Sequence, residues 1–164
     1  MTRILGLDPG LRVTGWGLIE TQGNRLRHLG DGAVATDAAE SVPRRLRALH
    51  EALAVLLRDL APDEAAVEET FVNRNPASTL KLGYARGVVL LAPSLAGIPV
   101  AEYAALSVKQ AVVGTGGATK EQVQAMVRRL LPGAEMRRAD AADALAVAIC
   151  HAHHRGTERR WRAA

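Results

Sequence analysis

The chain has 164 residues, of which 48% are hydrophobic, and this predicts one globular domain with a real core rather than a disordered segment. The formal net charge of +4 favours an acidic partner, nucleic acid first, although an ordinary soluble protein can carry the same charge. A single cysteine, Cys150, excludes an internal disulfide framework, and no leader-like or long apolar segment marks secretion or membrane insertion. We therefore expect a cytoplasmic protein without a membrane partner.

The apolar pattern predicts strands first and then an alternation of helices and strands. Short apolar or alternating runs bounded by turn residues are typical of strands, and apolar positions three and four apart are typical of helices. In chain order we expect strands at 4–7, 14–19 and 26–35, a helix at 41–60, a strand at 65–70, a helix at 77–95, a strand at 100–103, and helices at 107–113, 120–131 and 140–153. The first three strands form an antiparallel meander. The expected fold class is α/β, a five-stranded mixed sheet flanked by helices.

Acidic residues in apolar surroundings are the most informative feature of the sequence. They are Asp8, Glu68, Glu69, Asp140 and Asp143, and each one ends or opens an apolar segment. Desolvating an ionised carboxylate costs several kcal/mol unless a cation or strong donors meet it. A shared divalent cation accounts for the whole set.

Taken singly, these acids have ordinary structural explanations. An aspartate before Pro-Gly is a common turn former, and an aspartate in the first turn of a helix is a common cap. Asp140 and Asp143, however, lie on one helix face, where like charges repel unless something positive lies between them. Because successive strand side chains face opposite ways, one of Glu68 and Glu69 points away from the site, and the pattern leaves open which one.

Five segments carry a family-like set of motifs. They are ILGLDPG at 4–10 with RVTG at 12–15, VEETF at 67–71, LKLGYARG at 80–87, VKQAVVG at 108–114 and ADAADAL at 139–145. In order and spacing they resemble the RuvC family of Holliday-junction resolvases, over nearly the whole chain. The resemblance implies a ribonuclease H-like nuclease domain at 1–154, a homodimer, and Mg²⁺-dependent symmetrical nicking of four-way DNA junctions that leaves 5′-phosphate and 3′-hydroxyl ends. It also implies partnership with a branch-migration motor of the RuvA and RuvB type.

The resemblance assigns metal binding and catalysis to Asp8, Glu68, Asp140 and Asp143. It favours Glu68 over Glu69, since an uncharged residue is expected beside the catalytic glutamate. Carboxylates suit hard Mg²⁺, and in a two-metal site about 4 Å across one ion activates water while the other stabilises the leaving oxygen. We therefore expect two Mg²⁺ ions per site, with Mn²⁺ able to substitute, and no covalent protein nucleophile.

Lysine is used sparingly in this basic chain. Of the 21 lysine and arginine residues, only Lys81, Lys109 and Lys120 are lysines. Lysine kept at three places where arginine is the general choice favours a role for a compact ammonium group. The resemblance implies that Lys109 and Lys120 contact the scissile region and support catalysis, and that Lys81 binds backbone phosphate. Three solvated lysines on helix faces are the alternative.

The one phenylalanine, Phe71, precedes a polar segment at 73–76 that is typical of an exposed loop. An aromatic ring there can stack on a base unpaired at the crossover, a role that the resemblance supports, whereas a core position is the alternative. Arg74 and Arg86 are candidates for contacts with the DNA backbone, and Tyr84 is a weaker one.

The helix expected at 77–95 is apolar on more than one side. One stripe consists of Leu80, Tyr84, Val88, Leu91 and Leu95, with Gly83 and Gly87 beside it. Further apolar residues widen this surface beyond what packing on one sheet face needs. We expect a second subunit there, with Tyr84, Val88 and Leu91 at the dimer interface. A helix buried wholly within one subunit is the alternative.

The end of the chain is rich in histidine and arginine. His151, His153 and His154 are expected to complement the dipole of the last helix, with a transition-metal site as the alternative. Residues 155–164 are expected to form a mobile basic tail that adds nonspecific DNA affinity.

Three other functions fit parts of the sequence. A non-catalytic junction-binding protein would not need the four carboxylates, and a ribonuclease H-like nuclease acting on RNA would share them. An actin-like nucleotide-binding fragment is suggested by the turn at 8–10, but the chain is too short for a second lobe. The glycine-rich segment 114–117 lacks the Gly-Lys-Ser/Thr pattern of a Walker-type phosphate loop.

Overall fold

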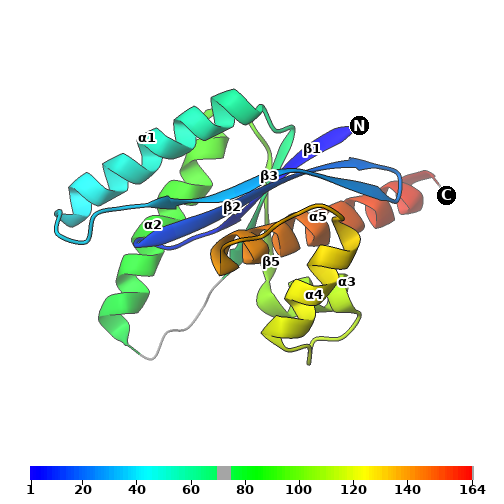
Figure 1. Ribbon diagram of the computed structural model, residues 1–164. Coiled ribbons are helices and arrows are strands. Elements are labelled where there is room, and N and C mark those ends of the chain that lie inside the picture. Colours follow the sequence, from blue (N-terminus) through cyan, green and yellow to red (C-terminus); the bar gives the residue numbers. More distant parts are fainter. Residues whose placement is uncertain (70–74, 164) are drawn as a thin grey trace.

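A five-stranded mixed sheet forms the centre of the molecule (Figure 1). The computed structural model describes residues 1–69 and 75–163. The strands are β1 (Thr2–Asp8), β2 (Val13–Gln22), β3 (Arg25–Ala35), β4 (Glu64–Glu69) and β5 (Val100–Ala104), in the order β3-β2-β1-β4-β5. β1, β2 and β3 pair antiparallel, whereas β4 pairs parallel with both β1 and β5. The predicted meander and the predicted fold class are confirmed.

Five helices are described, and they cover the two faces of the sheet. They are α1 (Val42–Leu60), α2 (Pro76–Leu95), α3 (Ala105–Val113), α4 (Lys120–Leu130) and α5 (Ala139–Ala163). Alternate side chains of each strand point to opposite faces, so two apolar clusters form. Leu5, Leu7 and Val67 pack with α1 and α2, while Ile4 and Ala66 pack with α3, α4 and α5. Figure 1 shows α1 and α2 on one side and α3 to α5 on the other.

Three glycines allow α5 to lie directly on the sheet. A Cβ atom at Gly6 would collide with the carbonyl oxygen of Ala144, and one at Gly15 with that of Asp140. A Cβ atom at Gly17 would lie 2.6 Å from the side chain of Leu145. The facing surface of α5 is mostly alanine, and its residues 141–150 are buried except Asp143. This close approach brings the start of α5 to the ends of the central strands.

The last helix differs from its predicted extent. It was expected to end at His153, and it continues to Ala163. Nothing in the sequence between these positions forces a stop, since the segment has no proline and its Gly156 is tolerated within the helix. The side chain of Arg155, which was assigned to the tail, pairs with Glu64. The domain boundary after residue 154, the mobility of the tail and its DNA affinity stay predictions.

No described helix is both long enough and apolar enough to cross a membrane.

Candidate active site

The predicted carboxylates meet where β1, β4 and α5 come together. Asp8 ends β1, and Glu68 follows Val67, which pairs with Leu7 of β1. Asp8 and Glu68 therefore lie side by side at the carboxyl ends of two parallel strands. Asp140 and Asp143 come from the first turns of α5. Ligand sites in sheets with parallel strands commonly lie at this edge.

Strand alternation decides between the two glutamates. Ala66 packs with α5 and Val67 packs with α1 and α2, so Glu68 points toward α5 and Glu69 points to the other face. The structure thus brings Glu68, and not Glu69, to the side of the sheet that carries Asp140 and Asp143.

The four carboxylates form one electrostatic cluster. Burial raises the pKa of Asp8 to about 7, and the negative charges of Asp143, Glu68 and Asp140 add to this rise. Burial, and after it the charge of Asp143, raises the pKa of Glu68. The pKa of Asp143 is also raised by burial, although Lys120 opposes the shift. Like charges in a partly desolvated site cannot all ionise without a compensating cation.

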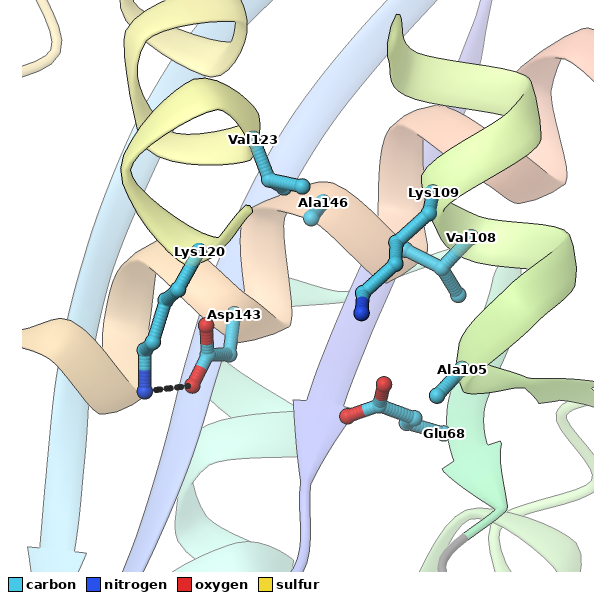
Figure 2. A pocket seen from close by; sticks show the side chains of 8 residues that line it. All are labelled: Glu68, Ala105, Val108, Lys109, Lys120, Val123, Asp143 and Ala146. Atoms are coloured by element: carbon cyan, nitrogen blue, oxygen red, sulfur yellow. Dashed lines mark ion pairs between the residues drawn. The ribbon is translucent and has the colours of Figure 1, made fainter. Parts of the chain in front are cut away.

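Two lysines complete the site. A pocket of about 250 Å³ is lined by Glu68, Ala105, Val108, Lys109, Lys120, Val123, Asp143 and Ala146. In Figure 2, Lys120 of α4 lies beside Asp143, and Lys109 of α3 points into the space between Asp143 and Glu68. The Lys120 ammonium lies 3.2 Å from an oxygen of Asp143, and the positive charges of both lysines lower the pKa of Glu68 against the effect of burial. The structure therefore brings both predicted catalytic lysines to the carboxylates.

The residues next to Lys120 determine where α4 begins. Thr119 and Gln122 form a capping box, in which each side chain accepts from the other residue's backbone N–H. Lys120 is the first residue of α4, and a hydrogen bond to Asp143, followed by the charge of Asp143, raises the pKa of its ammonium group. Lys120 thus places a positive charge in the lining of the pocket, next to Asp143.

The donor chemistry fits a hard divalent cation such as Mg²⁺, because the cluster offers carboxylate oxygens whose charge is not fully balanced. Within residues 1–69 and 75–163, no three histidine, cysteine, aspartate or glutamate side chains are close enough to hold an ion as they stand. Asp143 is paired with Lys120, and Asp140 with Arg138 at 3.2 Å. A metal ion bound by these two aspartates competes with two ion pairs.

Arg86 has a contact that the sequence did not predict. Its guanidinium donates to the backbone oxygen of Glu68 at 2.6 Å and pairs with the carboxylate of Glu102, and its side chain is only 16% exposed. Arg86 therefore holds the end of β4 at Glu68, the predicted catalytic position. Its predicted contact with the DNA backbone stays a prediction.

The other predicted binding residues are spread over α2 and the segment before it. Phe71 and Arg74 lie outside the described residues. Lys81 is exposed on α2 and does not line the pocket, whereas Tyr84 and Leu91 are 43% and 50% exposed on the same helix. Val88 is half-buried against the cluster that α1 and α2 share.

Sequence reasoning missed several residues that support the site. Arg138 pairs with Asp140, and Glu64, Tyr103 and His151 form a polar network under α5. The glycines under α5 had a readable signal, since Gly15 and Gly17 alternate in a strand and an alanine-rich helix follows later in the chain. The contacts of His151 with Glu64 and Tyr103 had none, because they join residues far apart in the sequence.

Comparisons with known proteins agree with this geometry. The family model described as "Crossover junction endodeoxyribonuclease RuvC" matches residues 4–151. The crossover junction endodeoxyribonuclease RuvC of Granulibacter bethesdensis is 71% identical over 159 residues, which are 97% of this chain and 89% of the relative. That of Gluconacetobacter diazotrophicus is 68% identical over 160 residues, covering 98% and 95%. This chain belongs to the RuvC family.

Solved structures support the same placement. Thermus thermophilus RuvC in complex with a Holliday junction substrate has a TM-score of 0.90 and 36% identity, over 96% of this chain and 97% of that one. The yeast mitochondrial Holliday junction resolvase has a TM-score of 0.74 at 14% identity, covering 98% and 82%, which shows a shared fold. The predicted RuvC resemblance is confirmed.

Burial of Asp8, together with the neighbouring carboxylates, predicts a pH-dependent loss of stability in the metal-free protein. The pKa of Asp8 is about 7 in the folded state, whereas its ordinary value is 3.8. Between these pH values the folded state binds a proton that the unfolded state has lost, so the free energy of unfolding falls as pH rises. In EDTA at pH 8, Asp8→Asn should raise the free energy of unfolding by about 1 kcal/mol or more. At pH 4 the gain should largely vanish. Urea denaturation at pH 4 and pH 8 measures the free energy of unfolding of each protein, with Asp37→Asn at an exposed turn as the control. An equal gain of Asp8→Asn at the two pH values would contradict the prediction.

Proposed function

We propose that this chain is a metal-dependent endodeoxyribonuclease that resolves four-way DNA junctions in recombination and repair. It makes paired, symmetrical nicks that leave 5′-phosphate and 3′-hydroxyl ends. The observation that carries the proposal is a pocket lined by two carboxylates and two lysines, Glu68, Asp143, Lys109 and Lys120, in a member of the RuvC family. The charges of Asp8 and Asp140 interact with this pair of carboxylates. A RuvC relative of the same fold has been solved with a Holliday junction substrate. The proposal includes a cytoplasmic location and cooperation with a motor of the RuvA and RuvB type.

The residues divide the chemistry among them. Asp8, Glu68, Asp140 and Asp143 would hold two Mg²⁺ ions, or Mn²⁺ in their place, which supply water activation and stabilise the leaving 3′-oxygen. Lys109 and Lys120 place ammonium groups beside the carboxylates, where a phosphate that carries developing negative charge has to lie. Lys120 can reach that phosphate once Asp143 is engaged elsewhere.

A covalent mechanism has no support in the described part of the pocket. The only cysteine, Cys150, is fully buried, and burial followed by the charge of Glu68 raises the pKa of its thiol to about 12. The reactive thiolate is therefore scarce at neutral pH. Direct attack by water is the simpler route.

Paired nicks need two active sites, which a twofold dimer supplies. The outer face of α2 offers a contact surface, because four large apolar side chains on one helical stripe are exposed: Leu80 (58%), Tyr84 (43%), Leu91 (50%) and Leu95 (68%). The opposite face, with Ala85, Val89 and Ala92, is buried in the monomer. We place the homodimer interface on the exposed stripe.

A synthetic mobile four-way junction tests the function directly. The protein should introduce two nicks at symmetry-related positions when Mg²⁺ is present and none in EDTA, as mapped on sequencing gels. A panel with an RNA–DNA hybrid and linear duplex distinguishes the alternatives. Cleavage of the hybrid but not of the junction would point to a nuclease acting on RNA, and binding without nicking would point to a junction-binding protein.

The carboxylates should be needed for cleavage but not for binding. Asp8→Asn, Glu68→Gln, Asp140→Asn or Asp143→Asn should each abolish nicking and leave junction affinity unchanged or tighter, because each removes a metal ligand and a charge that repels phosphate. Glu69→Gln is the matched control, since that side chain faces the other side of the sheet, and it should cut normally. Wild-type rates in any of the four variants would refute the assignment of that residue.

The α2 stripe predicts an effect on assembly. Leu91→Asp places a charge on the proposed interface without removing a buried side chain, and it should yield folded monomers that bind the junction poorly. Val88→Asp is less clear, because Val88 also packs within the monomer. Val55→Asp, at a 47% exposed apolar position on α1, is the control and should remain dimeric in sedimentation experiments. A Leu91→Asp variant that stays dimeric would move the interface elsewhere.

Two lysine-to-arginine variants separate charge from catalysis. Lys120→Arg keeps the positive charge but replaces a compact group, 3.2 Å from Asp143, by a bulkier one that cannot deprotonate. We expect single-turnover cleavage of saturated junction to slow by about a hundredfold. Lys81→Arg, on exposed α2, should cut at nearly the wild-type rate. Small and equal effects would mean that Lys120 only neutralises phosphate.

A further inference from the structure

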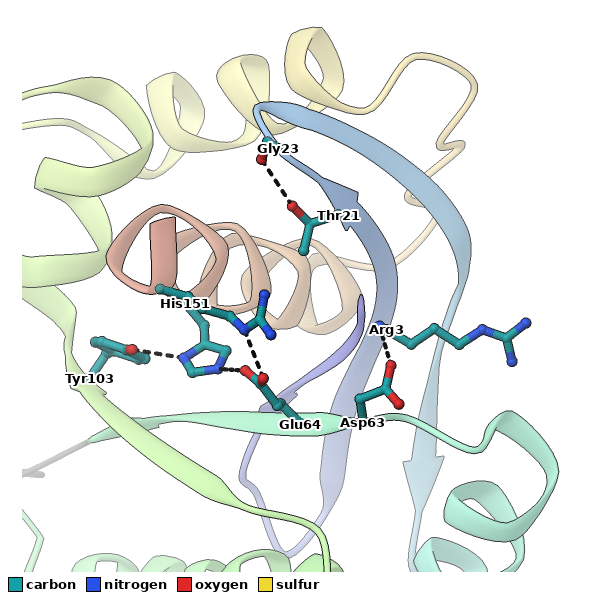
Figure 3. Close-up of polar contacts among 8 residues, drawn as sticks. Arg3, Thr21, Gly23, Asp63, Glu64, Tyr103 and His151 are labelled. Atoms are coloured by element: carbon teal, nitrogen blue, oxygen red, sulfur yellow. Dashed lines mark hydrogen bonds and ion pairs between the residues drawn. The ribbon is translucent and has the colours of Figure 1, made fainter. Parts of the chain in front are cut away.

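A polar network ties α5 to the start of β4, away from the pocket (Figure 3). Glu64, the first residue of β4, accepts a hydrogen bond at 2.7 Å from the Nε2 of His151 and another at 2.7 Å from the Nε of Arg155. The two donors use different carboxylate oxygens. All three side chains are at least three-quarters buried, with exposures of 22%, 13% and 19%.

The hydrogen-bond partners fix the roles of the His151 ring. A carboxylate of Glu64 accepts only, so Nε2 must carry the proton that it donates. The other nitrogen, Nδ1, lies 2.7 Å from the hydroxyl of Tyr103 on β5. The Tyr103 ring also lies against the ring of His154, with centroids 5.1 Å apart. The network therefore joins α5 to two neighbouring strands through contacts that depend on direction.

The network and the active site lie at opposite ends of one helix–strand contact. Asp143 of α5 is close to Glu68 of β4, while His151 of α5 contacts Glu64 of β4, so the two elements run antiparallel. Eight helical residues rise about 12 Å. Four strand residues span about 13 Å. The spacing of the two contacts thus matches along both elements, and a shift of α5 at one end moves Asp143 at the other.

The rest of the α5 contact is formed mainly by small residues. Over β1 and β2 the helix lies on Gly6, Gly15 and Gly17, and its own facing residues are mostly alanines. Such a surface sets how close the helix comes, and Leu145 over Gly17 is a large side chain that interlocks with it there. Directional hydrogen bonds to charged groups add a restraint, because they are lost when donor and acceptor move apart.

We propose that Glu64, His151 and Arg155 are positioning residues that set the place of α5 along β4, and so the position of Asp143 relative to Glu68. This deepens the proposed function, because the same carboxylates are its metal ligands. Tyr103 adds a second anchor, since it is paired in register with Glu68 on the adjacent strand. A displacement of about 1 Å in an active site can lower the rate by about a hundredfold, so the network is expected to affect chemistry from a distance.

A pair of neighbouring alanine variants tests this proposal. Glu64→Ala removes the anchor of α5, whereas Asp63→Ala removes a carboxylate that accepts from the backbone N–H of Arg3 at 2.8 Å and so ties β4 to β1. Figure 3 shows both contacts at the same end of the strand. Glu64→Gln, which keeps one acceptor oxygen, should give an intermediate result. Arg155→Met serves as a milder variant if Glu64→Ala does not fold.

Three measurements decide the outcome. With Glu64→Ala, Mn²⁺ binding to the DNA-free protein, followed by electron paramagnetic resonance, should weaken by about tenfold. Single-turnover cleavage should slow by about tenfold or more, and junction affinity in EDTA should stay within about twofold of wild type. Asp63→Ala should leave metal binding and cleavage unchanged even where its melting temperature falls equally.

The position of α5 provides a readout that needs no activity. A crystal structure of Glu64→Ala, or of Arg155→Met, should show α5 displaced along its axis relative to β4. An undisplaced helix, or equal losses in Glu64→Ala and Asp63→Ala, would overturn the proposal. If the wild type neither binds Mn²⁺ nor cuts the junction, the proposed function fails, while the displacement of α5 still tests the positioning role.

Discussion

The gathering of four carboxylates in a partly desolvated site is the constraint around which this molecule is built. Burial raises the pKa values of Asp8, Glu68 and Asp143, and neighbouring carboxylates add to each rise, which costs stability in the absence of a metal ion. The fold overcomes this cost with the surrounding core. Glycines let α5 touch the sheet, and large apolar clusters form on both faces. A rigid core thus holds in place a charge arrangement that would not assemble in a flexible chain.

Positive charge is distributed around this cluster in two different ways. Arg86 and Arg138 are engaged at the edges of the site, one with the backbone of Glu68 and the carboxylate of Glu102, the other with Asp140. Arg86 is only 16% exposed, whereas Arg138 and Lys120 are 52% and 59% exposed and are each paired with a metal-ligand candidate. An exposed ion pair contributes little to stability, so it can be exchanged at small cost. This difference separates Arg86, which holds the end of β4, from the exposed Arg138 and Lys120, whose ion pairs can be given up at small cost.

Much of the fold could be predicted because its signals are local. The meander at residues 2–35 has alternating strands and a turn at Gly23, and the capping residues of α4 stand directly before Lys120. The end of α5 was missed because what it packs against, including Glu64, lies far away in the sequence. The structure chooses Glu68 over Glu69 because it shows which face of the sheet each strand residue occupies. From the sequence alone, only the family resemblance favoured Glu68. The role of Arg86 at the end of β4 depends on a contact over 18 residues that no local pattern encodes.

The helices α2 and α5 lie on opposite faces of the sheet and differ in how much of their apolar surface the monomer buries. α5 buries its apolar residues in the monomer and carries two of the proposed metal ligands, Asp140 and Asp143, in its first turns. α2 buries Ala85, Val89 and Ala92 but leaves large side chains such as Leu91 and Leu95 exposed. A monomer gains nothing from a stripe of exposed leucines, whereas a twofold partner buries it from both subunits. Since α2 also reaches the end of β4 through Arg86, the proposed dimer contact on its outer face lies one helix away from the strand that carries Glu68.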